Sequence, residues 1–514
     1  MTVTDRFSDE APSGSGFPGH GESAPLELPA HLAASVLSRL LDGTHEAFAD
    51  TLAAVGNCQQ PIRLTGSTIT LDRATGEVLS SWSSDQAPLG ALYRPCGNRR
   101  AEVCLSCSRV YARDTFAMIR AGVAGGKTIP TTVATNPLLF VTLTAPSFGL
   151  VHGTRENNKP CRPRSSDRVE TCPHGVRLSC TARHAEDDAV VGSPLCWDCY
   201  DWTSAVVWQW HAPELWRRTT ITLRRALAAA LGVPPSRLKE RASVQYAKVA
   251  EYQARGIVHF HALIRLDGPD GPGSPAPLDA DALAELVATV ARSVTCPAPP
   301  TSETDSPRVI AWGRQLDVRT VRHHATARKS ETLSAGQVAG YLAKYATKDA
   351  SSGGLSQRPH VRRLAQVCRD LGALATRRHV LGHHRKGSTI VPLDPKTGRD
   401  HYALLGKWAH MAGFRGHFSS KSRRYSVTLG QLRRARQRYR RLLDQAARDG
   451  EALDTRDLEA RLLAAEDDDT TLVVGSWAYG GTGWPRIGDE ALAIAAAARA
   501  REYAQWKAAR RKNR

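Results

Sequence analysis

The amino-acid sequence predicts an α+β protein that combines an antiparallel hairpin and a further strand with several helices. Residues 138–144 form a β-branched and aromatic run, which is typical of a strand. Residues 243–252 and 257–266 are two strand-like segments joined by a short turn that contains glycine, and this pattern favours a hairpin. Residues 202–231 and 334–349 carry apolar side chains at helical spacing.

The rest of the chain divides by composition into regions. Residues 1–30 are rich in Ser, Gly, Pro and acidic residues, and we expect a disordered tail without a signal peptide. Residues 31–200 hold a helix and a Cys-rich, zinc-binding region that includes the strand 138–144. Residues 201–350 contain the hairpin. We expect a basic, helical, DNA-binding region over 351–450, and an acidic linker with a basic tail over 451–514.

Charge and cysteine usage narrow the class of protein. The 514 residues carry a formal net charge of +19, and the pI is about 9.7. A basic excess of this size favours a polyanionic partner such as nucleic acid, although an Arg-rich proteome would produce the same balance. No run of ~18 apolar residues predicts a membrane span. We therefore expect a cytoplasmic protein, whose eleven cysteines serve as metal ligands or reactive thiols rather than disulfides.

The hairpin carries a candidate metal site. His259 and His261 lie two residues apart on one strand, so they share a face. If residues 254–256 form a three-residue loop, Glu251 lies opposite His259 on that same face. Two imidazoles and one carboxylate, with open positions, suit Mg²⁺ or Mn²⁺ in phosphate chemistry. The alternative is a pair of histidines on an exposed strand face.

The helix 334–349 carries candidate catalytic residues. Tyr341 and Tyr345 lie four residues apart and so share one helix face, with Lys348 on the same side and Lys344 beside Tyr345. A phenol has a pKa near 10, so a nearby cation would favour the phenolate as a nucleophile. The alternative is an amphipathic helix with two packing tyrosines and solvated lysines.

Nine of the eleven cysteines fall between residues 58 and 199. Cys104–Cys107 and Cys196–Cys199 are two C-x-x-C pairs, a spacing that grips zinc from a tight turn. The candidate partners are Cys58 and Cys96 for the first pair, and Cys172, His174 and Cys180, with Cys161 in reserve, for the second. We expect one or two structural Zn²⁺ ions, since the two pairs could also share one ion. Buried free thiols are the alternative.

A basic segment follows the tyrosine helix. Between residues 411 and 450 there are eleven Lys and Arg against two Asp, which suits phosphate contacts along a duplex. A solvated, Arg-rich helix is the alternative. The candidate DNA-binding residues are Arg423, Arg424, Arg433, Arg434 and Arg438.

Residues 121–128 are similar to a phosphate-binding P-loop, but Ala121 stands where that motif has its first glycine. No strand is predicted directly before them. We interpret the segment as a Gly-rich turn, and expect unwinding of DNA to come from a host helicase.

Three motifs occur in a telling order: Phe140–Thr144, His259-Phe-His261 and Tyr341-x-x-Lys-Tyr345. This order resembles that of the HUH endonucleases, the rolling-circle replication initiators of small plasmids, phages and viruses. Residues 414–419 and 421–425, with the Cys-rich region, are similar to initiators of actinobacterial integrative, self-transmissible plasmids. The resemblance covers roughly residues 50–445.

The resemblance implies a ferredoxin-like core over residues 201–350, with the metal hairpin in the middle of the sheet and the tyrosine helix crossing it. It also implies a plasmid rolling-circle initiator that nicks and joins origin DNA through a 5′-phosphotyrosine. Tyr345 would attack first, and a host polymerase would extend the free 3′ end. Tyr341 or a water would resolve the link. Many plasmid initiators use a single tyrosine, with a glutamate that activates water in the second step. If this chain behaves in that way, Tyr345 is the nucleophile and Tyr341 only packs.

Two alternatives remain. A relaxase or single-strand transposase would use the same chemistry, although relaxases usually place the tyrosine before the histidines. A zinc-finger DNA-binding regulator would have no nuclease activity.

Overall fold

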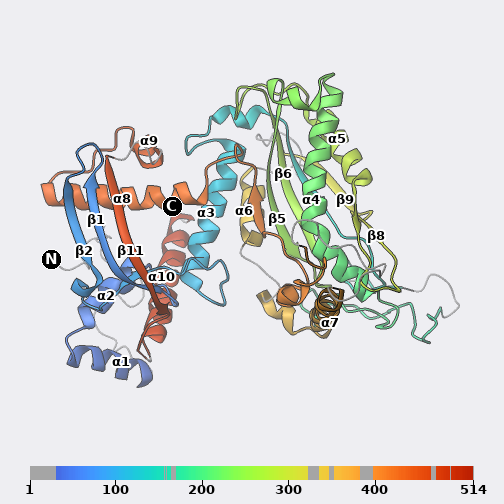
Figure 1. Cartoon of the computed structure of the whole chain (residues 1–514), viewed down its shortest axis with the longest axis horizontal. Coiled ribbons are helices and arrows are strands. Elements are labelled where there is room, and N and C mark those ends of the chain that lie inside the picture. Colours follow the sequence, from blue (N-terminus) through green and yellow to red (C-terminus); the bar gives the residue numbers. More distant parts are fainter. Residues whose placement is uncertain are drawn as a thin grey trace. The chain divides into compact units, whose positions relative to one another are not determined.

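In a computed structural model the chain forms two compact units: residues 1–111 with 465–514, and residues 112–464 (Figure 1). The structure describes residues 30–155, 157, 159–163, 170–321, 335–346, 352–382, 398–464, 470–486 and 488–512. All but the last residue of the expected N-terminal tail lies outside these ranges. The mixed α+β class is confirmed, with antiparallel pairing in every sheet.

The first unit joins the N-terminal and C-terminal segments of the sequence. Its central strand β1 pairs with β2 and β3, and along its whole length with β11. The region 451–514, expected as a linker and a tail, therefore contributes a strand and a long helix. The elements are α1 (Ala30–Leu41), α2 (His45–Ala54), β1 (Ile62–Asp72), β2 (Val78–Ser83), η2 (Ser84–Gln86), β3 (Leu92–Arg94), β11 (Thr471–Thr482) and α10 (Asp489–Lys512).

Two helices stand where one N-terminal helix was expected, because Gly43 adopts a left-handed φ of 68° between α1 and α2. A buried ion pair fastens α1 to α10: Arg39 Nε donates to Asp489 Oδ1 at 2.9 Å. The ring of Trp484 stacks on the ring of Tyr93, with centroids 5.1 Å apart. It also meets the ring of Phe48 edge-on, with centroids 5.0 Å apart. The core of this unit is thus built from residues that lie more than 350 positions apart.

The second unit is built on a five-stranded antiparallel sheet with the strand order β10-β5-β6-β4-β9. The strands are β4 (Leu138–Leu143), β5 (Ser243–Tyr252), β6 (Val258–Asp267), β9 (Leu316–Thr320) and β10 (Ser419–Lys421). Of these, β4, β5 and β6 match the three expected strand segments closely, and β9 and β10 are additional strands. The hairpin β5–β6 lies inside the sheet, and β6 is its central strand.

The remaining elements of this unit are mostly helical. They are α3 (Leu105–Ala124, whose first residues belong to the first unit), η3 (Thr131–Thr135), α4 (Trp202–Ala230), η5 (Pro235–Glu240), α5 (Ala280–Ser293), β7 (Thr295–Ala298), β8 (Arg308–Ala311), α6 (Ala335–Ala346), η6 (Ser352–Gln357), α7 (Pro359–Gly382), η7 (Leu405–Met411), α8 (Leu429–Asp449) and α9 (Leu458–Leu463). No described helix has both the length and the apolar character needed to cross a bilayer.

Alternation along β6 gives the sheet two different faces. Phe260, Ala262 and Ile264 point to one face, where they share the main hydrophobic core with α4 and α5 (Figure 1). Trp216 of α4 packs edge-on against Phe260 there. The other face presents the polar series of β6, which includes His259 and His261, and α6 lies against it.

The turn of the hairpin has the expected three residues. The amide of Gln253 donates to the carbonyl of Ile257 at 2.9 Å, and Gly256 adopts a φ of 76°. A Cβ at Gly256 would lie 2.9 Å from Val361 of α7, so glycine is required for space as well as for backbone conformation. The resulting register pairs Glu251 with His259, as predicted.

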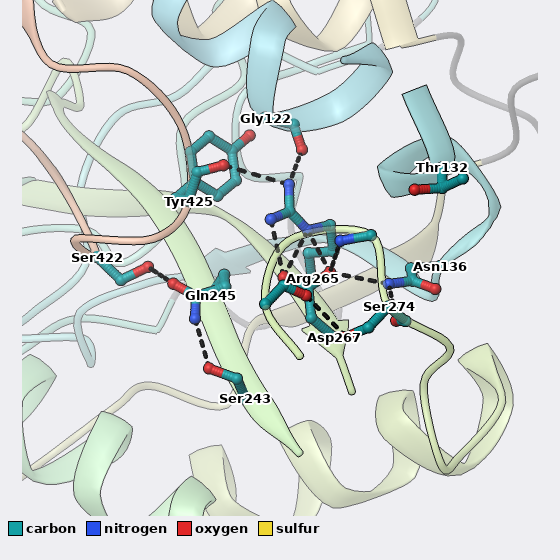
Figure 2. A network of polar contacts seen from close by, with 12 residues as sticks. Gly122, Thr132, Asn136, Ser243, Gln245, Arg265, Asp267, Ser274, Ser422 and Tyr425 are labelled. Atoms are coloured by element: carbon teal, nitrogen blue, oxygen red, sulfur yellow. Dashed lines mark hydrogen bonds and ion pairs between the residues drawn. The ribbon is translucent and has the colours of Figure 1, made fainter. Parts of the chain in front are cut away.

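A buried polar network holds the far end of β6 (Figure 2). Arg265 is fully buried and bonded to Asp267, with Nη2 to Oδ2 at 2.8 Å. The same guanidinium donates to the carbonyls of Gly122, in α3, and Tyr425. Asn136 donates to Asp267 at 2.8 Å. The segment 421–425, singled out from the sequence, therefore closes this network with its last residue.

The Gly-rich segment 121–128 follows a helix. α3 ends at Ala124, and a turn closed by a bridge between Gly126 and Ile129 comes next. A P-loop connects a strand to a following helix, so this turn does not have that geometry.

Candidate functional site

One carboxylate and two imidazoles converge on the α6 side of the sheet. His259 Nε2 lies 3.0 Å and His261 Nε2 lies 3.1 Å from the same oxygen, Glu251 Oε2. The two Nε2 atoms are 3.1 Å apart. We call these three residues the Glu–His–His triad. When ligand atoms bind a cation at ~2.1 Å and at right angles to each other, they lie about 3 Å apart. The spacing of the three donor atoms in the triad therefore suits a small divalent ion.

Neighbouring residues orient the inner histidine. Thr142 Oγ1 of β4 lies 3.1 Å from His261 Nδ1, which leaves Nε2 to face Glu251. Phe140 stacks on the same ring, with centroids 5.5 Å apart and planes 9° apart. Burial lowers the pKa of His261, and this favours the neutral imidazole that a metal needs.

The carboxylate of the triad is held in its charged form. Burial raises the pKa of Glu251, but hydrogen bonds from His259 and His261 outweigh burial, and the pKa lies below its ordinary value. Glu251 and His259 are part-exposed, with 17% and 16% of their side chains accessible. The triad thus contains a charged carboxylate and is open in part to solvent.

Tyr341 brings a phenol to the triad. Its hydroxyl lies 3.3 Å from His261 Nε2, and its ring meets the rings of His261 and Phe140 edge-on. Tyr341 is 39% exposed, so solvent reaches part of this residue. Tyr345 and Lys344 belong to α6 by their backbone, but their side chains lie outside the described part of the structure, as does Lys348.

A first set of four cysteines matches the sequence expectation. Cys58, Cys96, Cys104 and Cys107, the first Cys group, present sulfur atoms within 4.8 Å of one another. Cys58 lies 3.8 Å from Cys104 and 3.6 Å from Cys107. Backbone amides also point at the sulfurs, as they do around metal-bound thiolates: Cys96 N lies 3.3 Å from Cys58 Sγ.

The second set differs from the expectation in one residue. Cys172, His174, Cys196 and Cys199, the second Cys group, lie together, with His174 Nδ1 3.2 Å from Cys199 Sγ. Cys180, expected here, lies elsewhere, because two backbone hydrogen bonds pair it with Arg162, the neighbour of Cys161.

The described residues hold a third set, which the sequence analysis missed. It consists of His152, Cys161, Cys180 and His184, the third Cys group. Where one or two zinc sites were expected, the described part of the chain holds three four-ligand sets. The signal in the sequence that points to the third set is the Cys180-x-x-x-His184 spacing, which is less specific for zinc than the C-x-x-C pairs.

The candidate DNA-binding arginines are not equivalent. Arg423, Arg424 and Arg433 are exposed, and Arg434 is half-buried. Arg438, expected as a DNA contact, is instead buried, and its Nη1 donates to the carbonyl of Ala464 at 2.6 Å. The arginines of α8 lie on several faces of the helix, and Arg438 faces the end of α9 and the segment after it. Its guanidinium therefore makes hydrogen bonds inside the unit.

These features define a class: an α+β protein whose antiparallel sheet displays a Glu–His–His triad beside a phenol, and which carries three four-ligand Cys and His sets. Comparison with known proteins specifies it further. A family model described as RepSA, replication initiator protein, pSAM2, matches residues 44–498, and the chain belongs to this family.

A curated relative agrees with the family. The chain is 40% identical over 453 residues to a replication initiator protein from Streptomyces ambofaciens. The match covers 84% of this chain and 86% of the relative. No solved structure matches the chain.

Proposed function

We propose that this protein initiates plasmid replication by nicking one strand of origin DNA and later rejoining it, through a tyrosine of α6. The observation that carries the proposal is the 3.3 Å approach of the Tyr341 hydroxyl to the Glu–His–His triad. Membership of a replication initiator family, with a relative from Streptomyces, supports origin DNA as the partner. A HUH-type, ferredoxin-like core is part of the proposal.

The triad would hold Mg²⁺ or Mn²⁺, since its donors are one carboxylate and two imidazoles. When bound, such an ion supplies charge that polarises the scissile phosphate. The side chains of Glu251 and His259 are part-exposed, so a DNA backbone would reach the triad from their side, and Thr142 fixes the ring of His261.

The chemical step is a transesterification. A phenol oxygen of Tyr345 or Tyr341 attacks phosphorus, the bond from phosphorus to the 3′ oxygen breaks, and that oxygen gains a proton. The phenol gives up its proton to solvent. A 5′-phosphotyrosine and a free 3′-OH result, and the 3′-OH primes a host polymerase while a host helicase unwinds the template. When the origin sequence is regenerated, the second tyrosine, or water, cleaves the strand again and frees a second 3′-OH. That hydroxyl attacks the phosphorus of the 5′-phosphotyrosine, the new 3′–5′ phosphodiester forms, and the first tyrosine leaves and takes up a proton.

The two hydroxyls have distinguishable roles in this scheme. Tyr345 is our candidate for the first attack, with Tyr341 for the second, and Lys344 and Lys348 for stabilising the phosphate oxygens. Arg423, Arg424, Arg433 and Arg434 are proposed DNA contacts. The first and second Cys groups are proposed structural zinc sites.

The test is covalent trapping on single-stranded origin DNA with Mn²⁺, followed by mass spectrometry of the DNA-linked peptide. We expect the peptide that contains residues 341–345, and loss of the first adduct in Tyr345→Phe but not in Tyr341→Phe. Tyr439→Phe is the matched control, because Tyr439 of α8 is 40% exposed but remote in sequence from the triad. No adduct under any metal condition would favour the zinc-finger regulator.

A relaxase or single-strand transposase would give the same adduct, so the biology needs a second measurement. Plasmid copy number in a host that carries the cognate origin separates these functions. An initiator variant without its nucleophile abolishes replication, whereas a relaxase variant abolishes transfer and leaves copy number unchanged.

A further inference from the structure

We infer that the third Cys group is a third structural zinc site, and that it braces the hairpin that carries the Glu–His–His triad. Its ligands are His152, Cys161, Cys180 and His184, all in the second unit. Two thiolates and two imidazoles within reach of one point are the donor set that tetrahedral Zn²⁺ prefers. The inference stands on these residues and does not require the proposed nuclease activity.

The donor atoms are aimed at one another. Cys180 Sγ lies 3.5 Å from His184 Nε2, and Cys161 Sγ lies 3.9 Å from His152 Nδ1. Two thiolates and two imidazoles bound at 2.0–2.3 Å around one zinc ion are separated by ~3.3–3.8 Å, so the set needs only a small contraction.

A second observation points to a metal. The far nitrogen of His184, Nδ1, lies 2.9 Å from Asp188 Oδ2. A carboxylate on the outer nitrogen fixes the tautomer and leaves Nε2 with its lone pair toward the sulfur atoms, as in metal-bound histidines. The amide of Gly153 points at Cys161 Sγ from 3.2 Å, a contact that suits a thiolate.

The second and third Cys groups alternate along the chain. The ligand pairs occur in the order 152 and 161, 172 and 174, 180 and 184, 196 and 199, and they belong to the third, second, third and second group in turn. Between β4 and α4 the described residues form no regular helix or strand. Two interleaved ions would therefore supply the cross-links that this segment lacks.

The third Cys group leads directly to the hairpin turn. The amide of His152 donates to Ser193, and the amide of Gly192 donates to the carbonyl of His152 at 2.8 Å. Gly192 in turn lies against the turn: a Cβ there would be 2.3 Å from the carbonyl carbon of Ala254. Since that turn joins Glu251 to His259, an ion at the third Cys group would restrain the spacing of the triad.

Zinc content of the full chain is the direct test, measured by native mass spectrometry and elemental analysis. We expect three zinc ions per chain in the wild type, and a loss of at least one in Cys161→Ser and Cys180→Ser. Cys296→Ser and Cys368→Ser are controls, because both thiols are buried and lie outside every Cys group. Unchanged zinc content in Cys161→Ser and Cys180→Ser would overturn the inference.

Ligand exchange separates metal binding from a general folding defect. His184→Cys offers another zinc ligand, so we expect it to keep the ion that His184→Ala loses. Asp188→Asn leaves all four ligands in place, and we expect a 10- to 100-fold weaker hold on one zinc ion in chelator competition. Equal zinc retention by His184→Ala, His184→Cys and the wild type would contradict the proposed site.

Discussion

At the scale of single residues, the sheet contains a lysine where apolar side chains are usual. Lys248 of β5 points into the main core, with Nζ 2.9 Å from the carbonyl of His417 and 4.3 Å from the ring centre of Phe260. Burial lowers its pKa to about 7. Burial therefore disfavours the charged form of Lys248 in the folded protein, so the free energy of unfolding depends on pH.

The sign of that dependence follows from proton binding. Between pH 7 and pH 10.5 the unfolded chain holds a proton on Lys248 that the folded protein does not, so stability rises with pH in this window. Below pH 7 the full cost applies, on the order of a few kcal/mol. We predict that Lys248→Met stabilises the protein most at pH 7 and below, and that this gain in stability over the wild type shrinks toward pH 10.

Thermal unfolding of the wild type and of Lys248→Met from pH 6.5 to 10 measures the gain in stability that the substitution brings. Lys239→Met is the control, because Lys239 is exposed and should change stability little at any pH. A Lys248→Met advantage that does not vary with pH would show that the lysine is not the titrating group.

At the scale of elements, β6 carries two groups of polar side chains on one face. The triad histidines lie near its start, and the Arg265–Asp267 ion pair lies at its end (Figure 2). Removing one partner of a buried pair leaves an uncompensated charge and costs ~3–5 kcal/mol. We predict this loss for Arg265→Met in urea unfolding, with partial recovery in Arg265→Met/Asp267→Asn.

The same sheet offers a matched control. Arg319 and Asp317 form a pair at 2.8 Å with the same two-residue spacing on β9, but both side chains are more than 40% exposed. Arg319→Met should cost at most about 1 kcal/mol. Similar losses in Arg265→Met and Arg319→Met would mean that burial does not set the cost.

Local patterns predicted the elements around the triad well. The hairpin register followed from strand alternation and turn length, and Tyr341 followed from helical spacing, because both depend on neighbours in sequence. The third Cys group did not follow, because the Cys180–His184 spacing gives only two of its ligands, and the bridge between Arg162 and Cys180 brings Cys161 to them from a distant part of the sequence. Arg438 was misplaced for the same reason: its partners come from the segment after α9.

At the scale of the whole molecule, the first unit depends on contacts between distant segments. The pairing of β1 with β11 was missed because neither strand reveals its partner locally, and glycines such as Gly66 and Gly475 interrupt both patterns. The ion pair Arg39–Asp489 bridges 450 positions and is fully buried.

We predict that Asp489→Ala destabilises the first unit by ~3–5 kcal/mol, because Arg39 would keep a buried charge without its carboxylate. Hydrogen exchange should accelerate in β1 and β11 and stay unchanged in β4 and β6. Glu502→Ala is the control on the same helix, since Glu502 forms an exposed pair at 3.8 Å with Arg499. Equal acceleration in both units would contradict this division of stability.

The long antiparallel partnership of β1 and β11 also sets an order of events during synthesis. Roughly 400 residues separate the two strands, and at about 5–20 residues per second the ribosome needs about 20–80 seconds to bridge them. During that interval, β2 and β3 are the partners of β1 in the described structure that have already been made, and every strand of the five-stranded sheet emerges before β11 does. The first unit, whose N-terminal part is synthesised first, is therefore the last to complete its sheet. Until β11 emerges, the edge of β1 that pairs with it stays unpaired in the nascent chain.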